Sequence, residues 1–332
     1  MNTVIRCENV TKSYGDLRAV DGVSLEVRQG EIFGMIGPNG AGKTSLLECI
    51  EGLRSRDGGT IEVLGLDPEK DVTEVRERTG LQLQTSALPS RIKVGEALEL
   101  FSSFYRNPAD WRRILASLEL SEKEGAYVEK LSGGQRQRVF IALALVNNPE
   151  ILFVDEITTG LDPQTRHRVW DVIRSIRDAG TTVVLTTHFM EEAERLCDRV
   201  AIVDRGRIVA VDTVPNLIAK LGAENSVSFT VDRQPPVQLL ESVEGVTRVQ
   251  VTGDRVVVHG GGDRFAQRVM GVLADADLSV GDFQSQRASL EDVFLALTGR
   301  HMPEPQQDDD DAPHARGRGG RRARKARKGG AR

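Results

Sequence analysis

A glycine-rich octapeptide between two apolar segments most constrains what this chain can fold into. Residues 37–44 read Gly-Pro-Asn-Gly-Ala-Gly-Lys-Thr, which fits the pattern G-x-x-x-x-G-K-[ST], and they follow a short apolar run at residues 32–36. Leu46, Leu47 and Ile50 come next at helical spacing. A strand that turns tightly into a helix start brings backbone N–H groups and the positive end of a helix to one point. The motif therefore predicts a site for nucleotide phosphates.

The residues of this loop have complementary roles in holding a nucleoside triphosphate. The glycines let backbone N–H groups curl around phosphate oxygens. Lys43 is expected to reach the β- and γ-phosphates, and the hydroxyl of Thr44 to hold magnesium. The predicted phosphate-binding set is Gly37, Pro38, Asn39, Gly40, Ala41, Gly42, Lys43, Thr44 and Ser45.

The chain has 332 residues, enough for two domains and a tail. Over residues 1–222, β-branched runs alternate with longer segments of helical period, which predicts an α/β fold with crossover helices around a mainly parallel sheet. The clearest strands are expected at residues 32–36, 151–155 and 182–187. A helix is expected at residues 163–179, with Asp162 as its N-cap.

A second, small α+β domain is expected at residues 223–300. Val227, Phe229 and Val231 alternate with polar residues, as expected for a half-buried strand. The same alternation recurs twice, at Val249 and Val251 and at Val256 and Val258. Helices are expected at residues 265–274 and from Ser289, where Asp292 completes a capping box. This last helix has one apolar face, expected to pack on its own domain, with a groove for a partner as the alternative.

Two further segments carry chemistry. Residues 151–156 form an apolar strand that ends in Asp155 and Glu156, and two carboxylates there are costly to bury unless a cation compensates. Asp155 is therefore expected to organise magnesium, and Glu156 to accept a proton from an attacking water. Residues 131–135 read Leu-Ser-Gly-Gly-Gln before a helical run, so that Ser132 can cap a helix start that would bind an anion.

The three motifs, in this order and spacing, resemble those of ABC transporter ATPases over residues 4–219. The resemblance implies ATP and Mg²⁺ as cofactors, the ABC cassette fold of P-loop NTPases, and an antiparallel β subdomain and a helical subdomain beside the main sheet. It also implies a head-to-tail dimer of two copies. In that dimer Ser132 and Gly134 of one copy would touch the γ-phosphate held by Lys43 of the other. The signature residues assigned to nucleotide binding are Ser132, Gly133, Gly134 and Gln135.

The resemblance assigns further roles along the chain. Gln84 resembles the glutamine that reaches magnesium, with Gln82 as the alternative. His188 corresponds to the histidine that contacts the γ-phosphate and the attacking water, and Asp162 to the loop that crosses the dimer interface. Tyr14 resembles the aromatic residue on which adenine stacks. One departure is Ile157, which stands where the family usually has proline after the catalytic glutamate.

The second domain narrows the resemblance. Residues 288–295, with the strands before them, are similar to the accessory domain of daunorubicin-resistance-type drug and antibiotic exporters. This implies an ATPase that powers efflux of a drug-like or amphipathic substrate. The longest apolar stretch, residues 139–146, is far below the ~18 residues of a membrane span. A separate membrane permease subunit and a peripheral place on the cytoplasmic face of the cell membrane are therefore expected.

The last 32 residues, 301–332, are expected to form a disordered tail, acidic at residues 308–311 and then basic. The basic run is either a solvated end or a contact with anionic lipid. It also gives some support to an alternative class, a soluble ABC ATPase that remodels a ribosome or nucleic acid. Such proteins usually carry two cassettes, and only one is found in this sequence, so no specific nucleic-acid partner is expected.

Overall fold

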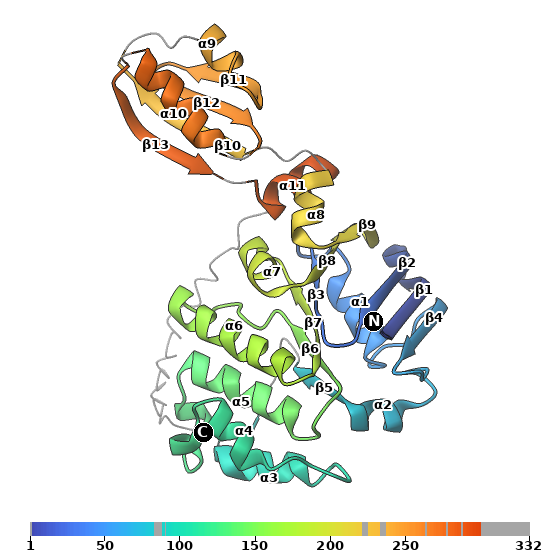
Figure 1. The fold of residues 1–332 in the computed structure, drawn as a ribbon. Helices are drawn as coiled ribbons and strands as arrows, with labels where there is room; N and C mark the ends of the chain where they lie inside the picture. The colour runs from blue at the N-terminus through green and yellow to red at the C-terminus, as the bar shows by residue number, and fades with distance from the viewer. Residues whose placement is uncertain are drawn as a thin grey trace, which may run out of the picture.

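The computed structural model describes residues 2–82, 88–89, 91–220, 225–232, 237–262, 264–276, 278–286 and 288–299. At its centre lies a six-stranded sheet (Figure 1). Its strands are, in spatial order, β5 (Thr79–Gln82), β6 (Ile151–Asp155), β7 (Thr182–Thr187), β3 (Ile32–Ile36), β8 (Arg199–Asp204) and β9 (Arg207–Asp212). The first five are parallel and β9 is antiparallel to β8. The predicted α/β fold with a mainly parallel sheet is confirmed, including the bounds of β3, β6 and β7.

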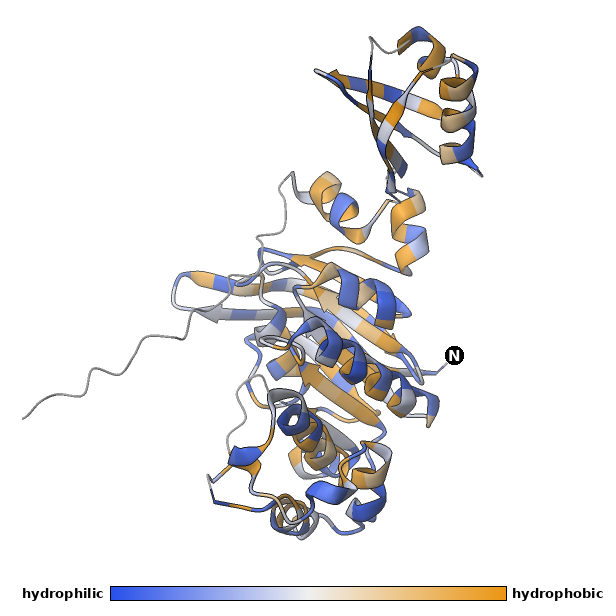
Figure 2. Ribbon diagram, turned by 90° about the vertical axis from the view of Figure 1, so that its left-hand side faces the viewer, coloured by the Kyte–Doolittle hydropathy of each residue, from blue (hydrophilic) through white to orange (hydrophobic). Residues whose placement is uncertain are grey.

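The central strands are apolar because both faces of the sheet are covered. On β6, Leu152 and Val154 point into one hydrophobic core, while Ile151 and Phe153 point into another. Figure 2 shows hydrophobic strands in the middle of the molecule and hydrophilic colour on the outer surfaces of the helices. Side chains that alternate along a strand thus serve two cores.

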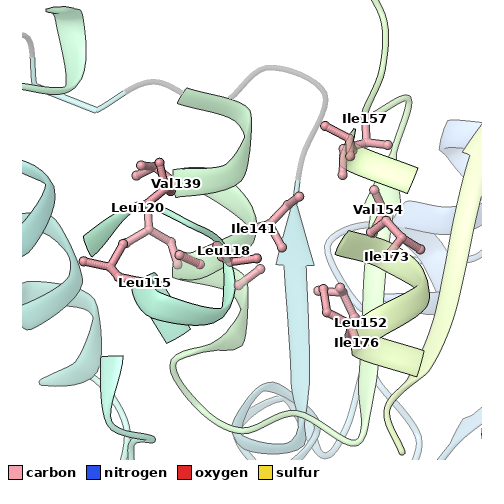
Figure 3. Close-up of a cluster of buried hydrophobic side chains, with 14 of the residues drawn as sticks. Leu115, Leu118, Leu120, Val139, Ile141, Leu152, Val154, Ile157, Ile173 and Ile176 are labelled. Atoms are coloured by element: carbon pink, nitrogen blue, oxygen red, sulfur yellow. The ribbon is translucent and has the colours of Figure 1, made fainter. Parts of the chain in front are cut away.

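Two groups of elements cover these faces. On one side α1 (Lys43–Ile50) lies between the central sheet and an antiparallel three-stranded sheet of β1 (Thr3–Tyr14), β2 (Leu17–Arg28) and β4 (Gly58–Val63). The other core is lined mainly by helices (Figure 3): α3 (Val94–Ser102), α4 (Trp111–Ser117), α5 (Gly133–Leu145) and α6 (Pro163–Asp178). Two 3₁₀ turns, Ser121–Lys123 and Val128–Lys130, complete this region, whereas the short α2 (Val72–Arg78) packs Val75 into the core around α1.

A separate four-stranded antiparallel sheet follows. Its spatial order is β11 (Val246–Thr252), β12 (Arg255–Gly260), β10 (Asn225–Val231) and β13 (Val280–Gln286). The helices α9 (Val237–Glu241) and α10 (Phe265–Asp275) pack with it around a core that includes Phe229, Val258 and Val269. The three predicted strands and the helix at 265–274 are confirmed, whereas β13 and α9 were not predicted.

The last described helix, α11 (Leu290–Thr298), does not pack on this sheet as expected. Its apolar residues Leu290, Val293 and Phe294 are fully buried against α7 (Met190–Leu196) and α8 (Val214–Lys220) of the first region (Figure 1). The backbone N–H of Leu290 also donates to the Glu194 carboxylate on α7 at 2.6 Å. The periodicity predicted the apolar face correctly, but the expectation of what the face packs against was wrong. The division of the chain at residue 222 stays a prediction.

Across the described ranges, no helix is both long enough and apolar enough to span a bilayer. The predictions for Gln84 and for the tail at residues 301–332, including its contact with anionic lipid, fall on residues outside the described ranges.

Candidate functional site

The predicted phosphate loop lies where β3 ends and α1 begins. Gly42 is the N-cap of α1 with φ 101°, a left-handed conformation that favours glycine, and a Cβ there would stand 2.1 Å from the Ala19 carbonyl oxygen. The loop opens onto a cavity of about 390 Å³. The cavity is lined by Tyr14, Leu17, Ala19, Asn39, Gly40, Gly42, Lys43, Thr44, Ser45 and Glu156. Leu17 and Ala19, near the start of β2, therefore line the cavity together with residues of the phosphate loop.

Lys43 lies beneath this loop with its side chain 4% exposed. Its Nζ donates to the carbonyl oxygens of Gly37 at 2.8 Å and Pro38 at 3.1 Å, and it lies 3.8 Å from Oε1 of Glu156. Burial lowers the pKa of Lys43, while the charges of Glu156 and Asp155 act in the opposite direction. A buried ammonium group at a helix start is suited to bind a phosphate oxygen.

Asp155 ends β6 beside the loop, close to Thr44 in the first turn of α1. Its Oδ1 accepts hydrogen bonds from Thr44 Oγ1 at 3.4 Å and from Thr186 Oγ1 on β7. Burial raises the pKa of Asp155, and the hydrogen bonds from both threonines oppose that rise. A carboxylate and a hydroxyl oxygen in a buried position are the kind of donors that a hard cation such as Mg²⁺ prefers, so the residues present fit this ion.

Glu156 has its backbone in the left-handed region, at φ 47°, which is disfavoured for a residue with a side chain. Its backbone N–H is held by Thr186, with both the carbonyl and the hydroxyl oxygen at 3.2 Å. Its Oε1 lies 3.3 Å from Nδ1 of His188, which follows β7 directly. This contact with His188 lowers the pKa of Glu156, with help from the charge of Lys43. Lys43, Glu156 and His188 are thus brought together.

Tyr14 closes the other end of the cavity. Its hydroxyl donates to Ser45 Oγ at 3.4 Å, and the guanidinium carbon of Arg54 lies 5.2 Å from its ring centroid. Tyr14 is 38% exposed and lines the cavity. An exposed aromatic face beside a phosphate site is suited to stack a base.

The signature segment lies apart from this cavity. Ser132 is the N-cap of α5: its Oγ accepts from Gln135 N at 3.3 Å, and the Gln135 side chain accepts from Ser132 N at 3.1 Å. A Cβ on Gly134 would stand 2.2 Å from Cγ2 of Thr165, and one on Gly133 would contact Leu161. These four residues do not line the cavity that holds Lys43.

Asp162 is close to the signature segment, because Thr165 belongs to the first turn of α6. Its carboxylate accepts from Thr165 N at 3.0 Å, which confirms its N-cap role, and the hydrogen bonds from Thr165 lower its pKa. The starts of α5 and α6 therefore lie side by side. Ile157, the departure from the family pattern, is buried among Val154 and Ile173 (Figure 3) and packs the loop onto the core.

Some site residues were not predicted. Thr186 contacts both Asp155 and Glu156, yet a threonine inside an apolar strand is ordinary sequence. Leu17 and Ala19 line the cavity from β2, and their only signal was their place just after Tyr14. Gln82, the alternative to Gln84, is buried on β5 beside Val154 of β6.

Comparisons with known proteins agree with this geometry. The model of the ABC transporter family matches residues 20–159. A Nod factor export ATP-binding protein I from Paraburkholderia xenovorans is 40% identical over 90% of this chain and 98% of its own length. A daunorubicin resistance ATP-binding protein from Streptomyces coeruleorubidus is 37% identical over 90% of this chain and 96% of its own length. The chain belongs to the family of ABC transporter ATP-binding proteins, and it is an ABC-type ATPase.

Solved structures point to the same fold. The ADP conformation of an ATP-binding cassette of an ABC transporter has a TM-score of 0.60 and 27% identity, and the match covers 67% of this chain and 95% of that one. A dimeric cassette in a post-hydrolysis state, bound to ADP and Pi, has a TM-score of 0.57 and 28% identity over 63% of this chain and 98% of that one.

Proposed function

We propose that this protein is the ATP-hydrolysing subunit of an exporter, which moves a drug-like or amphipathic substrate through a separate membrane permease subunit. The observation that carries the catalytic part is the meeting of Lys43, Asp155, Glu156 and His188 around one phosphate loop. Export is supported by the similarity to relatives named for Nod factor export and daunorubicin resistance, which extends over nearly their whole lengths.

In the proposed mechanism the loop and Lys43 bind the triphosphate of ATP, and Tyr14 stacks on adenine. Thr44 and Asp155, with Gln84, would hold Mg²⁺, which would neutralise phosphate charge. Glu156 orients the attacking water and accepts its proton. Its lowered pKa keeps the carboxylate in the basic form at neutral pH. His188 fixes the carboxylate through the 3.3 Å contact and reaches the γ-phosphate. Most of the catalysis would come from positioning and charge.

A second copy of the chain would complete each site. The segment of Ser132, Gly133, Gly134 and Gln135 begins a helix whose N–H groups can bind an anion, yet it does not line the cavity of its own chain. We infer that it closes over the γ-phosphate held by Lys43 of a second copy. Asp162 would then lie at the same interface, since α5 and α6 begin together. Two ATP molecules would bind the copies together, and hydrolysis would release them.

The proposed location is peripheral, on the cytoplasmic face of the cell membrane, where the permease would hold the cassettes. The test of this part is transport. Inside-out vesicles that contain the chain with its permease should accumulate a fluorescent amphipathic dye when Mg-ATP is added, and Glu156→Gln should abolish the accumulation. Phosphate release without any ATP-dependent movement of amphipathic dyes would reject a drug-like substrate and keep the ATPase.

A further inference from the structure

Glu192 on α7 is an acidic residue that is fully buried. Its Oε1 accepts two hydrogen bonds, from the Thr158 hydroxyl at 2.9 Å and from Nε1 of Trp170 at 2.8 Å. A carboxyl group is costly to bury, and hydrogen bonds from two other segments offset that cost. The two donors come from different parts of the chain, so this one oxygen joins three segments.

Each of these segments carries a residue of the proposed reaction. Thr158 lies two residues after Glu156, in the loop that leaves β6. Trp170 is on α6, whose N-cap Asp162 ends the same loop. Glu192 itself is four residues after His188. The carboxyl group therefore connects the middle of the Glu156 loop to the helix that follows His188.

The packing around Trp170 strengthens this connection. The indole is 2% exposed, with the His167 ring stacked at 4.8 Å and the guanidinium carbon of Arg195 at 5.6 Å from its centroid. Nearer the site, the Phe189 ring lies 4.2 Å from both the His188 ring and the guanidinium carbon of Arg166 on α6. The helix α6 thus contacts the segment after His188 at two levels. Glu192 adds a polar contact between α6 and α7, as does Arg174, which donates to the Arg195 carbonyl oxygen at 2.8 Å.

We propose that Glu192 is a positioning residue, which holds Glu156 and His188 at their mutual distance. The proposal rests on the function proposed above. The left-handed backbone of Glu156 persists only if neighbouring contacts maintain it, and the Thr158 contact with Glu192 is one of them, beside the N–H bonds to Thr186. The 3.3 Å contact between Glu156 and His188 would then change when the loop moves relative to α7. A misplacement of about 1 Å in a reacting group can cost about 10²-fold in rate.

The experiment compares two substitutions in the full chain. Glu192→Leu removes both accepted hydrogen bonds, and we expect kcat for ATP hydrolysis to fall by about 10- to 100-fold, as when an outer-shell partner of an active-site ligand is lost. KM should stay within about threefold of its original value, since the phosphate loop is unchanged. Glu192→Gln keeps an oxygen acceptor, and its nitrogen takes the place of Oε2, which has no hydrogen-bond partner among the described residues. It should therefore restore most of kcat.

Ile176→Ala is the control for stability alone. Ile176 is buried on α6 in the same core, beside Leu152 and one turn further from the Glu156 loop than Ile173 (Figure 3), so this variant should lower Tm while kcat stays within about twofold. Equal losses of kcat in Ile176→Ala and Glu192→Leu would overturn the proposal, as would an unchanged kcat in folded Glu192→Leu. If Glu192→Leu does not fold, Thr158→Val decides, because it removes one donor with little change in volume. A lower kcat at constant KM supports the proposal, and an unchanged kcat rejects it.

Glu156→Gln, measured beside these variants, distinguishes failure of the proposed reaction from failure of the positioning role of Glu192. If turnover survives Glu156→Gln, the proposed reaction itself is wrong. If turnover is lost there but kept in both Glu192→Leu and Thr158→Val, only the positioning role fails.

Discussion

Two helix starts in this molecule are suited to bind anions, and they differ in what surrounds them. The start of α1 contains the buried Lys43 and lies beside Asp155, which ends β6 on the central sheet, and beside Glu156, which follows it. The start of α5 lies apart from that cavity, next to the start of α6, and Ser132 and Gln135 satisfy each other's N–H groups. The first brings groups for phosphate binding and for proton transfer together within one chain. The second offers backbone donors that need a ligand brought by another molecule.

The largest effect on turnover is expected when the proposed base is removed from the site at α1. Glu156→Gln keeps the size of the side chain and removes its proton affinity, so turnover should fall by about 10²- to 10⁴-fold while ATP still binds. Phosphate release and nucleotide binding by filtration measure the two properties. Glu150→Gln is the matched control, because Glu150 stands just before the opposite end of β6 and pairs with Arg78. If another residue acted as the base, turnover would stay unchanged in Glu156→Gln, and the proposed role of Glu156 would be wrong.

The next largest effect is expected on binding. Lys43→Ala removes a buried charge that faces the loop carbonyls, and hydrogen bonds to charged groups contribute about 1.5–3 kcal/mol each. Affinity for Mg-ATP should fall by roughly 10²-fold, measured by fluorescence titration or calorimetry. Lys70→Ala, at an exposed surface lysine, should leave it unchanged. Equal affinity in Lys43→Ala would refute the site at α1.

A smaller effect tests the start of α5. Ser132→Ala removes a helix cap that contributes about 1 kcal/mol. Because the same segment is proposed to close over the γ-phosphate held by the second copy, turnover should fall by about tenfold while ATP binding to a single chain stays intact. Ser289→Ala is the matched control, since Ser289 forms the same kind of capping box on α11, away from the site. An equal mixture of Lys43→Ala and Ser132→Ala chains should recover part of the turnover, because one composite site would then have both halves intact. No recovery would contradict the head-to-tail dimer.

The smallest expected effect is on pH dependence. His188 holds the pKa of Glu156 below its ordinary value of 4.5, so the base is charged at neutral pH and turnover declines only in acid. Without the imidazole this pKa rises, and the acid limb of kcat in His188→Ala should move to higher pH. The midpoint of that limb is compared, rather than the rate, because His188→Ala also lowers the rate itself. A limb that stays in place would mean that His188 does not set the pKa of Glu156.

The sequence predicted most of the cassette because its signals are local. Strands β3, β6 and β7 are short apolar runs bounded by turn residues, and the phosphate loop lies between a strand and a helix. Strand β13 was missed because residues 280–286 are mostly polar and exposed, and α9 because it has only five residues. What α11 packs against could not be read from its periodicity, since an apolar face does not name its partner. Thr186 and Glu192 gain their roles from residues far away in the chain.

The docking of α11 changes how the small sheet domain should be regarded. The chain leaves the cassette at α8 and returns to it at α11, so β10–β13 are spliced into the cassette rather than appended to it. A chain cut after α8 would remove Leu290, Val293 and Phe294 from the core that they share with α7 and α8, and would thereby expose apolar surface of these two helices. Excision of the sheet alone, with α8 rejoined to α11 by a short linker, would leave that surface covered. The small domain is thus tethered at both ends, and its second tether, α11, packs on α7, the helix that follows His188.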